Sequence, residues 1–280
     1  MRIRATVAAL SGTLALSALA LPAAHAADAP KASEATTFAA KAPADTVEGD
    51  TKITKITVNG GKDIVVGTSA KKSVKISVTA TDPSGIEDAV AFLWHGTDFD
   101  AENGIDGSMV PDQETGDCKV VDATTSTCSV TVVADPKENI YGNVLAGKWK
   151  VWTIAQGKDG DHVQKDAFPT SVSVKRAAKL TTNASPEPIK KGKTLTVTGA
   201  LTRANWDTLK YAGYTQQSVQ LQYKKKGASS YTTLKTVKSD TKGNLKTTVK
   251  ASADGYFRYV FAGTSTTPSV TSTADFVDVQ

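Results

Sequence analysis

Carboxylates are the chemically reactive side chains that this sequence concentrates most strongly in one place. Residues 82–122 contain eleven of them and a single lysine, Lys119. Calcium prefers six to eight oxygen ligands, several of them charged, on a turn that can fold around the ion. The segment is therefore a candidate calcium site, and we expect its ligands to come from the carboxylates that superficially match a calcium-binding loop: Asp98, Asp100, Glu102 and Asp106.

The match to an EF-hand loop fails at two positions. That motif needs glycine at its sixth position and glutamate at its twelfth, where this sequence has Asn103 and Met109. A calcium site of another geometry remains open, with Asp82, Asp159 or Asp161 as alternative ligands at the ends of loops. The alternative is a solvated acidic loop, residues 98–117, that keeps the protein soluble.

Three aromatic residues in the second half of the chain share one long connection: Trp206, Tyr211 and Tyr214. Polar side chains are interleaved with them, and exposed rings beside polar donors stack on sugars or anchor a protein partner. We therefore expect a binding site here. The alternative is that the three rings complete the core at one end of a β-sandwich.

Catalytic motifs are not found. After the leader the chain has only two histidines, His95 and His162, and both are expected to be structural surface residues. No G-x-S-x-G, H-E-x-x-H, G-x-x-x-x-G-K-[ST] or strand-following G-x-G-x-x-G pattern occurs. The sequence therefore predicts a protein that is not an enzyme. Nucleic-acid binding is not expected either, because the basic residues are spread over several strands.

The two cysteines, Cys118 and Cys128, are expected to form a disulfide, because each is the other's only possible partner in an exported chain. The bridge would close a loop of about eleven residues, which chain-entropy arguments value at about 2–3 kcal/mol. We expect it to join a hairpin of strands Cys118–Val121 and Cys128–Val133. The spacing fits neither a C-x-x-C redox motif nor a zinc site.

The N-terminus has the features of a secretory signal peptide, residues 1–26. Arg2 and Arg4 precede an apolar run, and Ala24-His25-Ala26 is a small-x-small cleavage site. A membrane anchor is the weaker alternative, and no later segment is apolar enough to span a bilayer. Residues 27–50 are rich in Ala, Lys, Thr, Asp and Pro, so we expect a flexible linker. The mature protein is expected to be secreted and extracellular.

Period-2 alternation dominates the rest of the chain. Ser73–Gly96 has two alternating runs around the turn Asp82–Gly85, which predicts a hairpin. Its inward side chains should include Trp94, packed with Trp149 or Trp152, and its turn should lie near Asp159–Asp161. With the strands that follow, this hairpin makes residues 51–176 a β-sandwich domain.

Residues 177–280 contain seven further short strands at near-regular spacing, which predicts a second sandwich. The charge changes sign at the same place: residues 27–176 have a net charge of −6 and residues 177–280 a net charge of +9. The predicted fold class is therefore all-β, with two immunoglobulin-like sandwiches in tandem after a signal peptide.

Two resemblances support this organisation. Thr79–Ile86 (TATDPSGI) and Gly147–Val151, with Ala155 and Asp159-Gly160, resemble the bacterial immunoglobulin-like modules attached to secreted enzymes. The whole chain resembles a family of secreted actinomycete (Streptomyces-type) proteins without established function, some of them called calcium-binding. Five blocks carry the second resemblance: Met1–Ala9, Arg203–Asp207, Leu209–Tyr214, Val219–Tyr223 and Gly255–Tyr259. It implies no catalytic residue.

Together these observations predict a secreted, monomeric, non-catalytic protein that serves as an extracellular binding or structural module. Its partner would be a cell-wall polymer, a polysaccharide or another secreted protein. The alternative function is calcium binding through the acidic loop, residues 98–117.

Overall fold

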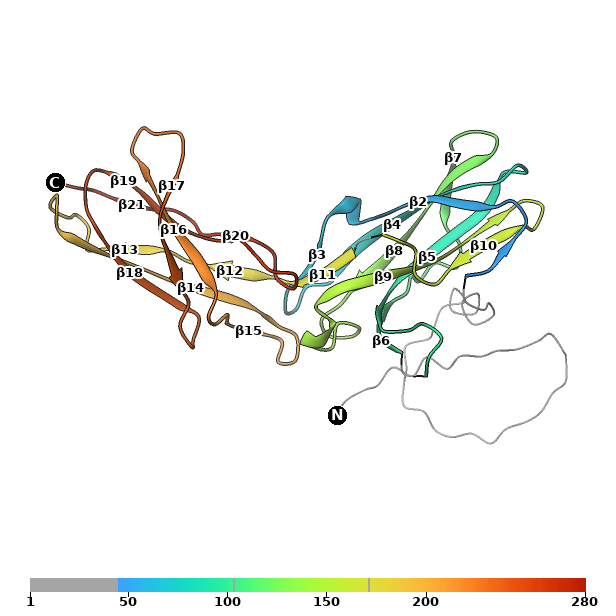
Figure 1. Cartoon of the computed structure of the whole chain (residues 1–280), viewed down its shortest axis with the longest axis horizontal. Coiled ribbons are helices and arrows are strands. Elements are labelled where there is room, and N and C mark those ends of the chain that lie inside the picture. Colours follow the sequence, from blue (N-terminus) through green and yellow to red (C-terminus); the bar gives the residue numbers. More distant parts are fainter. Residues whose placement is uncertain (1–44, 103, 171) are drawn as a thin grey trace. The chain divides into compact units, whose positions relative to one another are not determined.

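The computed structural model describes residues 45–102, 104–170 and 172–280, which form β-strands, turns and two short 3-10 segments (Figure 1). The all-β prediction is confirmed. The predicted signal peptide, and the predicted linker up to residue 44, lie outside the described residues. The prediction of a linker is wrong for its last residues, because Val47–Glu48 forms strand β1, which pairs with β10 (His162–Lys165). In the described ranges no helix has the length and hydropathy needed to cross a membrane.

The first sandwich begins with a four-stranded antiparallel sheet. Its inward side chains, such as Val74, Ile76 and Val78, are buried, and hydroxyl side chains alternate with them. Two hydroxyl pairs link neighbouring strands on the outer face, one of them Thr79 and Thr127 with oxygens 3.0 Å apart. The strands, in order across the sheet, are β2 (Lys52–Val58), β4 (Lys72–Thr81), β8 (Thr125–Ala134) and β7 (Asp117–Val120).

A seven-stranded sheet faces it. The order is β1-β10-β9-β11-β3, with β5 beside β9 and β6 beside β5. This is the immunoglobulin-like arrangement, because β2, β4, β8 and β7 correspond to strands A, B, E and D, and β5, β9 and β11 to strands C, F and G. The strands are β1 (Val47–Glu48), β3 (Ile64–Val66), β5 (Ile86–Gly96), β6 (Ile105–Met109), β9 (Gly147–Gly157), β10 (His162–Lys165) and β11 (Val172–Arg176).

The predicted hairpin over Ser73–Gly96 is wrong in its pairing. Both strands exist, but β4 pairs with β2 and β8, whereas β5 pairs with β6 and β9. The turn Asp82–Gly85 therefore connects one sheet to the other. The prediction failed because alternation shows which face of a strand is buried, but it does not show which strand lies beside it.

Trp94, Trp149 and Trp152 are all buried, as predicted, at most 2% exposed. Phe92, two residues before Trp94 and on the same face of β5, stacks on Trp152 with ring centres 5.0 Å apart.

The second sandwich also has two antiparallel sheets. In one, β14 pairs with β12, β13, β15 and β18; in the other, the order is β17-β16-β19-β20, with β21 also beside β19. The core between them includes Leu195, Val197, Leu221, Phe257 and Tyr259. The strands are β12 (Ala178–Leu180), β13 (Asn183–Ser185), β14 (Thr194–Asn205), β15 (Lys210–Gly213), β16 (Ser218–Lys225), β17 (Thr232–Lys238), β18 (Asn244–Lys250), β19 (Gly255–Phe261), β20 (Val270–Thr271) and β21 (Asp275–Val277).

Two short strands lie where the sequence predicts loops. Strand β6 occupies part of the acidic segment, and β15 occupies part of the connection that carries Tyr211. Both are strands of four or five residues that pair with one long neighbour, β5 or β14. Their own sequences alternate weakly, so the pairing rather than the local pattern determines their conformation.

The chain divides into two compact units, and the division is not a single cut. The first unit contains the described residues up to 62, residues 72–134 and residues 148–172; the second contains residues 63–71, 135–147 and 173–280. Two short segments from the first half of the sequence therefore belong to the second unit. By this division β3, and β11 after its first residue, are counted with the second unit, although both strands are hydrogen-bonded members of the seven-stranded sheet.

Candidate functional sites

The four carboxylates predicted to bind calcium lie on the loop after β5 and on β6. Asp98 accepts a hydrogen bond from the backbone N–H of Asp100 (3.1 Å), and Asp106 lies 2.5 Å from the Nδ1 atom of His95. In the described ranges, only two groups bring three metal-ligating atoms within 4.8 Å, and neither contains any of these four residues. Calcium binding by this loop, whose position 103 is not described, therefore stays a prediction.

One of those two groups is formed by Asp82, Asp159 and Asp161, the alternative ligands that the sequence suggests. The turn after β4 and the turn after β9 meet here: the N–H of Lys158 donates to the carbonyl of Gly85 (2.9 Å). This confirms that the Asp82–Gly85 turn lies beside Asp159–Asp161. We call these three carboxylates the acidic end cluster.

Asp82 is the buried member of the acidic end cluster, with 1% of its surface exposed. Its Oδ2 accepts a hydrogen bond from the hydroxyl of Thr51 (2.6 Å), and its Oδ1 accepts from the N–H (2.8 Å) and hydroxyl (2.6 Å) of Ser84. The bonds from Ser84 and Thr51 hold the pKa of Asp82 below its ordinary value, because they stabilise the carboxylate. It therefore stays ionised at neutral pH.

The other two members are more accessible. Asp161 accepts a hydrogen bond from the N–H of Asp50 (2.8 Å) and donates its own N–H to Asp159 (3.2 Å). Asp159 is exposed. The arrangement offers a cation one buried and two accessible carboxylates, while protein donors already hold Asp82 in place.

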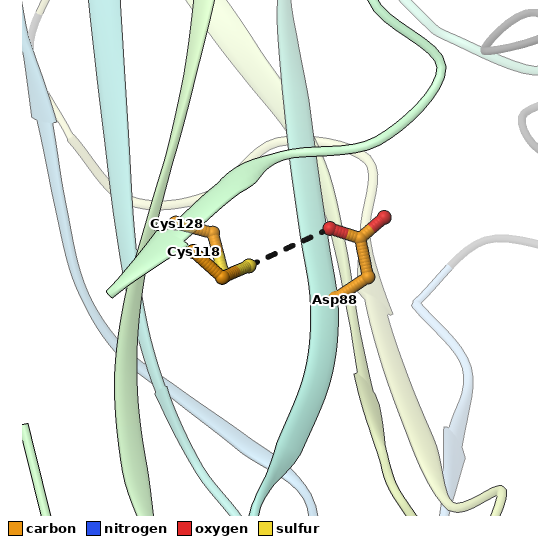
Figure 2. Close-up of side chains that lie close together, drawn as sticks. All are labelled: Asp88, Cys118 and Cys128. Carbon is orange, nitrogen blue, oxygen red and sulfur yellow. Dashed lines mark hydrogen bonds between the residues drawn. A yellow bond between two sulfur atoms is a disulfide. The ribbon is translucent and has the colours of Figure 1, made fainter. Parts of the chain in front are cut away.

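The second group is Asp88 with Cys118 and Cys128, which Figure 2 shows in close-up. The two cysteines form a disulfide between β7 and β8, as predicted. A disulfide sulfur has no hydrogen to donate and is not a thiolate, so the 3.6 Å approach of Cys118 Sγ to Asp88 is a contact and the group is no metal site. Asp88 instead accepts backbone bonds from Gly116 and Ala89, and burial raises its pKa.

The three aromatic residues predicted to bind a ligand lie in or against the core of the second unit. Trp206 is 1% exposed, and its indole N–H donates to the carbonyl of Gly67 (3.0 Å). Tyr214 is also buried, and Tyr211 is half-buried beneath the ammonium of Lys179, 3.9 Å from the ring centre. The structure therefore agrees with the alternative interpretation for Trp206 and Tyr214, whose rings are not available to a sugar.

The two histidines each have a carboxylate neighbour. His95, on β5, faces Asp106 at 2.5 Å, and His162, on β10, lies 3.7 Å from Glu48. The rings of His95 and Trp149 lie 5.5 Å apart. Each histidine therefore lies on a strand that is paired on both sides and has a carboxylate beside it.

A different set of aromatic rings gathers on the outer face of the sheet that contains β16, β19 and β21. Alternation along β19 places Phe257 and Tyr259 in the core and Tyr256 and Arg258 on the outside. We call the resulting surface the cation–aromatic face, and its residues are Lys224, Lys226, Tyr231, Tyr256, Arg258 and Phe276.

The strand register explains why these side chains meet. Tyr256 lies directly opposite Lys224 on β16 and Phe276 on β21. The rings of Tyr256 and Phe276 are 5.1 Å apart, and the Lys224 ammonium is 5.2 Å from the centre of the Tyr256 ring. Side chains directly opposite on one face of an antiparallel pair are close enough to pack.

Cations and rings alternate along the face. The Arg258 guanidinium lies 3.6 Å above the ring of Tyr231, and the Lys224 ammonium is 5.1 Å from the same ring. Arg258 also donates to the side-chain oxygen of Gln222 (3.0 Å), which fixes the direction of the guanidinium. At the other end, Lys226 lies 5.6 Å from the Phe276 ring and 3.4 Å from Asp254. The result is a half-buried row of flat rings with positive groups between them.

Sequence reasoning did not find this face, because its members come from four separate segments. The signal available was the spacing of two residues between Tyr256 and Arg258 on one strand and between Gln222 and Lys224 on another, which places each pair on one face of its strand. Each shows that polar and aromatic side chains point outwards. Their convergence depends on the register between strands, which a single sequence does not specify.

Comparisons with known proteins give one family of unknown function and several solved structures of low sequence identity. The family of unknown function DUF5707 matches residues 64–155. No curated protein matches the chain.

Among solved structures, the fibronectin(III)-like modules of Clostridium thermocellum CbhA are similar at 10% identity and a TM-score of 0.30, over 80% of this chain and 93% of theirs. A marsupial T cell receptor is similar at 10% identity and a TM-score of 0.37, over 82% of this chain and 73% of its own. Latent PorU from Porphyromonas gingivalis is similar at 11% identity and a TM-score of 0.28. The match covers 82% of this chain but only 20% of the PorU chain.

Proposed function

We propose that this chain is a secreted, non-catalytic binding protein whose second unit binds anionic polysaccharides of the cell envelope through the cation–aromatic face. The observation that carries the proposal is the row of rings and cations formed by Tyr231, Tyr256, Phe276, Lys224 and Arg258. We propose this face as the binding site instead of the predicted Trp206 and Tyr214, whose rings are buried.

The two kinds of side chain suit the two parts of an anionic sugar. The apolar face of a sugar ring packs on an aromatic ring, and a carboxylate or phosphate group forms charge-assisted hydrogen bonds with guanidinium and ammonium groups. Gln222, which already holds Arg258, offers amide groups to sugar hydroxyls. The net charge of +9 over residues 177–280 favours the approach of any polyanion.

The test is a binding isotherm of the purified chain with polygalacturonate, an anionic polysaccharide, and with uncharged dextran as the control. Tyr256→Ala and Arg258→Gln should each weaken polygalacturonate binding. Matched controls are Tyr141→Ala, at an exposed tyrosine outside the face, and Lys242→Gln, at an exposed lysine outside it. Equal binding of dextran, or equal losses in the control variants, would reject the proposal.

Calcium binding in the first unit is a second candidate function, which the acidic end cluster favours. Three ligand atoms, from Asp82, Asp159 and Asp161, lie within 4.8 Å of one another. A cation that binds only the folded state stabilises it by RT ln(1 + [L]/Kd), which is about 2.7 kcal/mol at a hundred times Kd. Millimolar Ca²⁺ should therefore raise the melting temperature relative to chelator.

Two single substitutions separate the end cluster from the acidic loop. Asp159→Asn should remove the calcium-dependent stabilisation if the end cluster binds the ion. Asp98→Asn should remove it if the loop, residues 98–117, binds the ion as the sequence predicts. A melting temperature that is the same in calcium and in chelator would exclude both sites.

A further inference from the structure

A groove runs along one edge of the second sandwich, between β17 of one sheet and β18 of the other. Its volume is about 520 Å³, which lies within the range of about 300–1,000 Å³ typical of ligand sites. Its apolar floor consists of the packed rings of Tyr223 and Phe257, with centres 4.9 Å apart, together with Val249 and Leu234. The side chain of Leu234 is 43% exposed, so an apolar group at the groove remains open to solvent.

The rim of the groove is positively charged. Lys235 and Lys250 both line it, and none of its nine described lining residues is acidic. The Lys235 ammonium crosses from β17 to donate to the carbonyl of Thr248 (2.6 Å), and the Lys250 ammonium donates to the hydroxyl of Thr194 (3.0 Å). An ammonium has three N–H donors, so each lysine keeps donors for an incoming carboxylate.

The two strand edges beside the groove are unsuited to pairing with another strand. The register of β17 shifts beside Leu234, which is the extra residue of a bulge opposite Leu221 and Gln222. Lysines project along both strands, and Lys235 already binds the edge carbonyl of Thr248. Bulges and inward-pointing charges are the features that protect sheet edges from strand addition. A ligand here must therefore be recognised by its side chains.

We infer that the groove binds an extended acidic peptide segment whose carboxylates alternate with aliphatic side chains. Charge complementarity requires the carboxylates, which would meet Lys235 and Lys250. The exposed Leu234 and the neighbouring Val249 require an aliphatic group between them, which a peptide carries and a polysaccharide lacks. The groove thus differs in chemistry from the cation–aromatic face, where rings and not aliphatic side chains are displayed.

The test uses the intact chain and a fluorescent decapeptide of alternating glutamate and valine, with a lysine–valine decapeptide as the charge control. The double variant Lys235→Gln with Lys250→Gln should weaken glutamate–valine binding at least about tenfold, since two charge-assisted contacts are lost. Leu234→Ser should weaken it about threefold through lost apolar burial. Lys246→Gln, an exposed lysine on β18 outside the groove, is the matched control and should change the affinity less than about twofold.

The inference is overturned if the parent chain does not bind the glutamate–valine peptide, if the lysine–valine peptide binds equally well, or if the double variant binds the glutamate–valine peptide like the parent chain. It is also overturned if the double variant loses polygalacturonate binding and no peptide binds, because the groove would then belong to the polysaccharide site. If the parent chain binds the glutamate–valine peptide but not polygalacturonate, the proposed function alone is rejected, because the groove shares no described lining residue with the cation–aromatic face.

Discussion

Asp82 provides the sharpest test of how the first unit is held together. Asp82→Ala removes a buried carboxylate that accepts hydrogen bonds from the Thr51 hydroxyl and from the N–H and hydroxyl of Ser84. The Ser84 hydroxyl has a second acceptor in the carbonyl of Gly85 (3.3 Å), so two donors are left unpaired. The buried Thr51 hydroxyl costs about 1–3 kcal/mol when it is left unpaired, and the N–H of the more exposed Ser84 costs about 1 kcal/mol, so the free energy of unfolding should fall by about 2–4 kcal/mol at pH 7. Asp82→Asn keeps an acceptor oxygen and should cost about 1 kcal/mol.

The pH dependence of this effect has a definite sign. The hydrogen bonds from Ser84 and Thr51 lower the pKa of Asp82 in the folded state, so the unfolded state takes up its proton first as the pH falls. The stabilisation is therefore complete above the ordinary aspartate pKa of about 4 and is lost as the pH falls through the lower, folded value. The difference in stability between the parent chain and Asp82→Asn should be largest at neutral pH and should shrink by pH 3.

The assay is urea unfolding at pH 7 and pH 3, followed by the fluorescence of the buried tryptophans Trp94, Trp149 and Trp152 of the first unit. Asp112→Ala, at an exposed position, is the control and should change stability by less than about 0.5 kcal/mol. A variant Asp82→Ala as stable as the parent chain at pH 7, or an equal loss of stability at both pH values, would contradict the assigned role of the Asp82 carboxylate.

Two further predictions concern stability. Trp206→Ala should destabilise the second unit by about 3–5 kcal/mol, because it leaves a cavity in place of a buried indole, whereas Tyr211→Ala should cost less than about 1 kcal/mol. Equal losses of stability in urea unfolding would contradict the assignment of Trp206 to the core. Replacing Cys118 and Cys128 together by serine should cost the first unit about 2–3 kcal/mol, because a short closed loop is released in the unfolded chain; a melting temperature unchanged by reductant or by the double variant would show that the disulfide adds nothing.

The sequence predicts well the features that depend on local alternation and on covalent chemistry. Period-2 patterns identify most strands of both sandwiches, and the two cysteines are paired across neighbouring strands as expected. The meeting of the Asp82 turn with Asp159 and Asp161 is also predicted, because both turns follow long strands of the same sandwich. The strand patterns depend only on residues that are close together in the sequence.

What the sequence does not predict depends on the third dimension. Strands β4 and β5 are joined by a four-residue turn, yet they lie in different sheets. The local sequence does not distinguish a turn that connects two sheets from a turn that closes a hairpin. Trp206 has the composition of a ligand-binding neighbourhood, but its ring and its indole N–H are used inside the second unit. Tyr256, Lys224 and Phe276 are far apart in sequence and meet only through strand register.

The central claim is that the cation–aromatic face recognises the sugar rings of an anionic polymer as well as its charge. The most direct measurement compares the affinity of the parent chain and of Tyr256→Ala for polygalacturonate at low and at intermediate salt. Stacking on Tyr256 is little affected by salt, so the variant should bind about three- to tenfold more weakly at both concentrations, although both proteins bind less tightly as salt is added. Equal affinities of the two proteins at each salt concentration would show that charge alone holds the polymer, and would contradict the account.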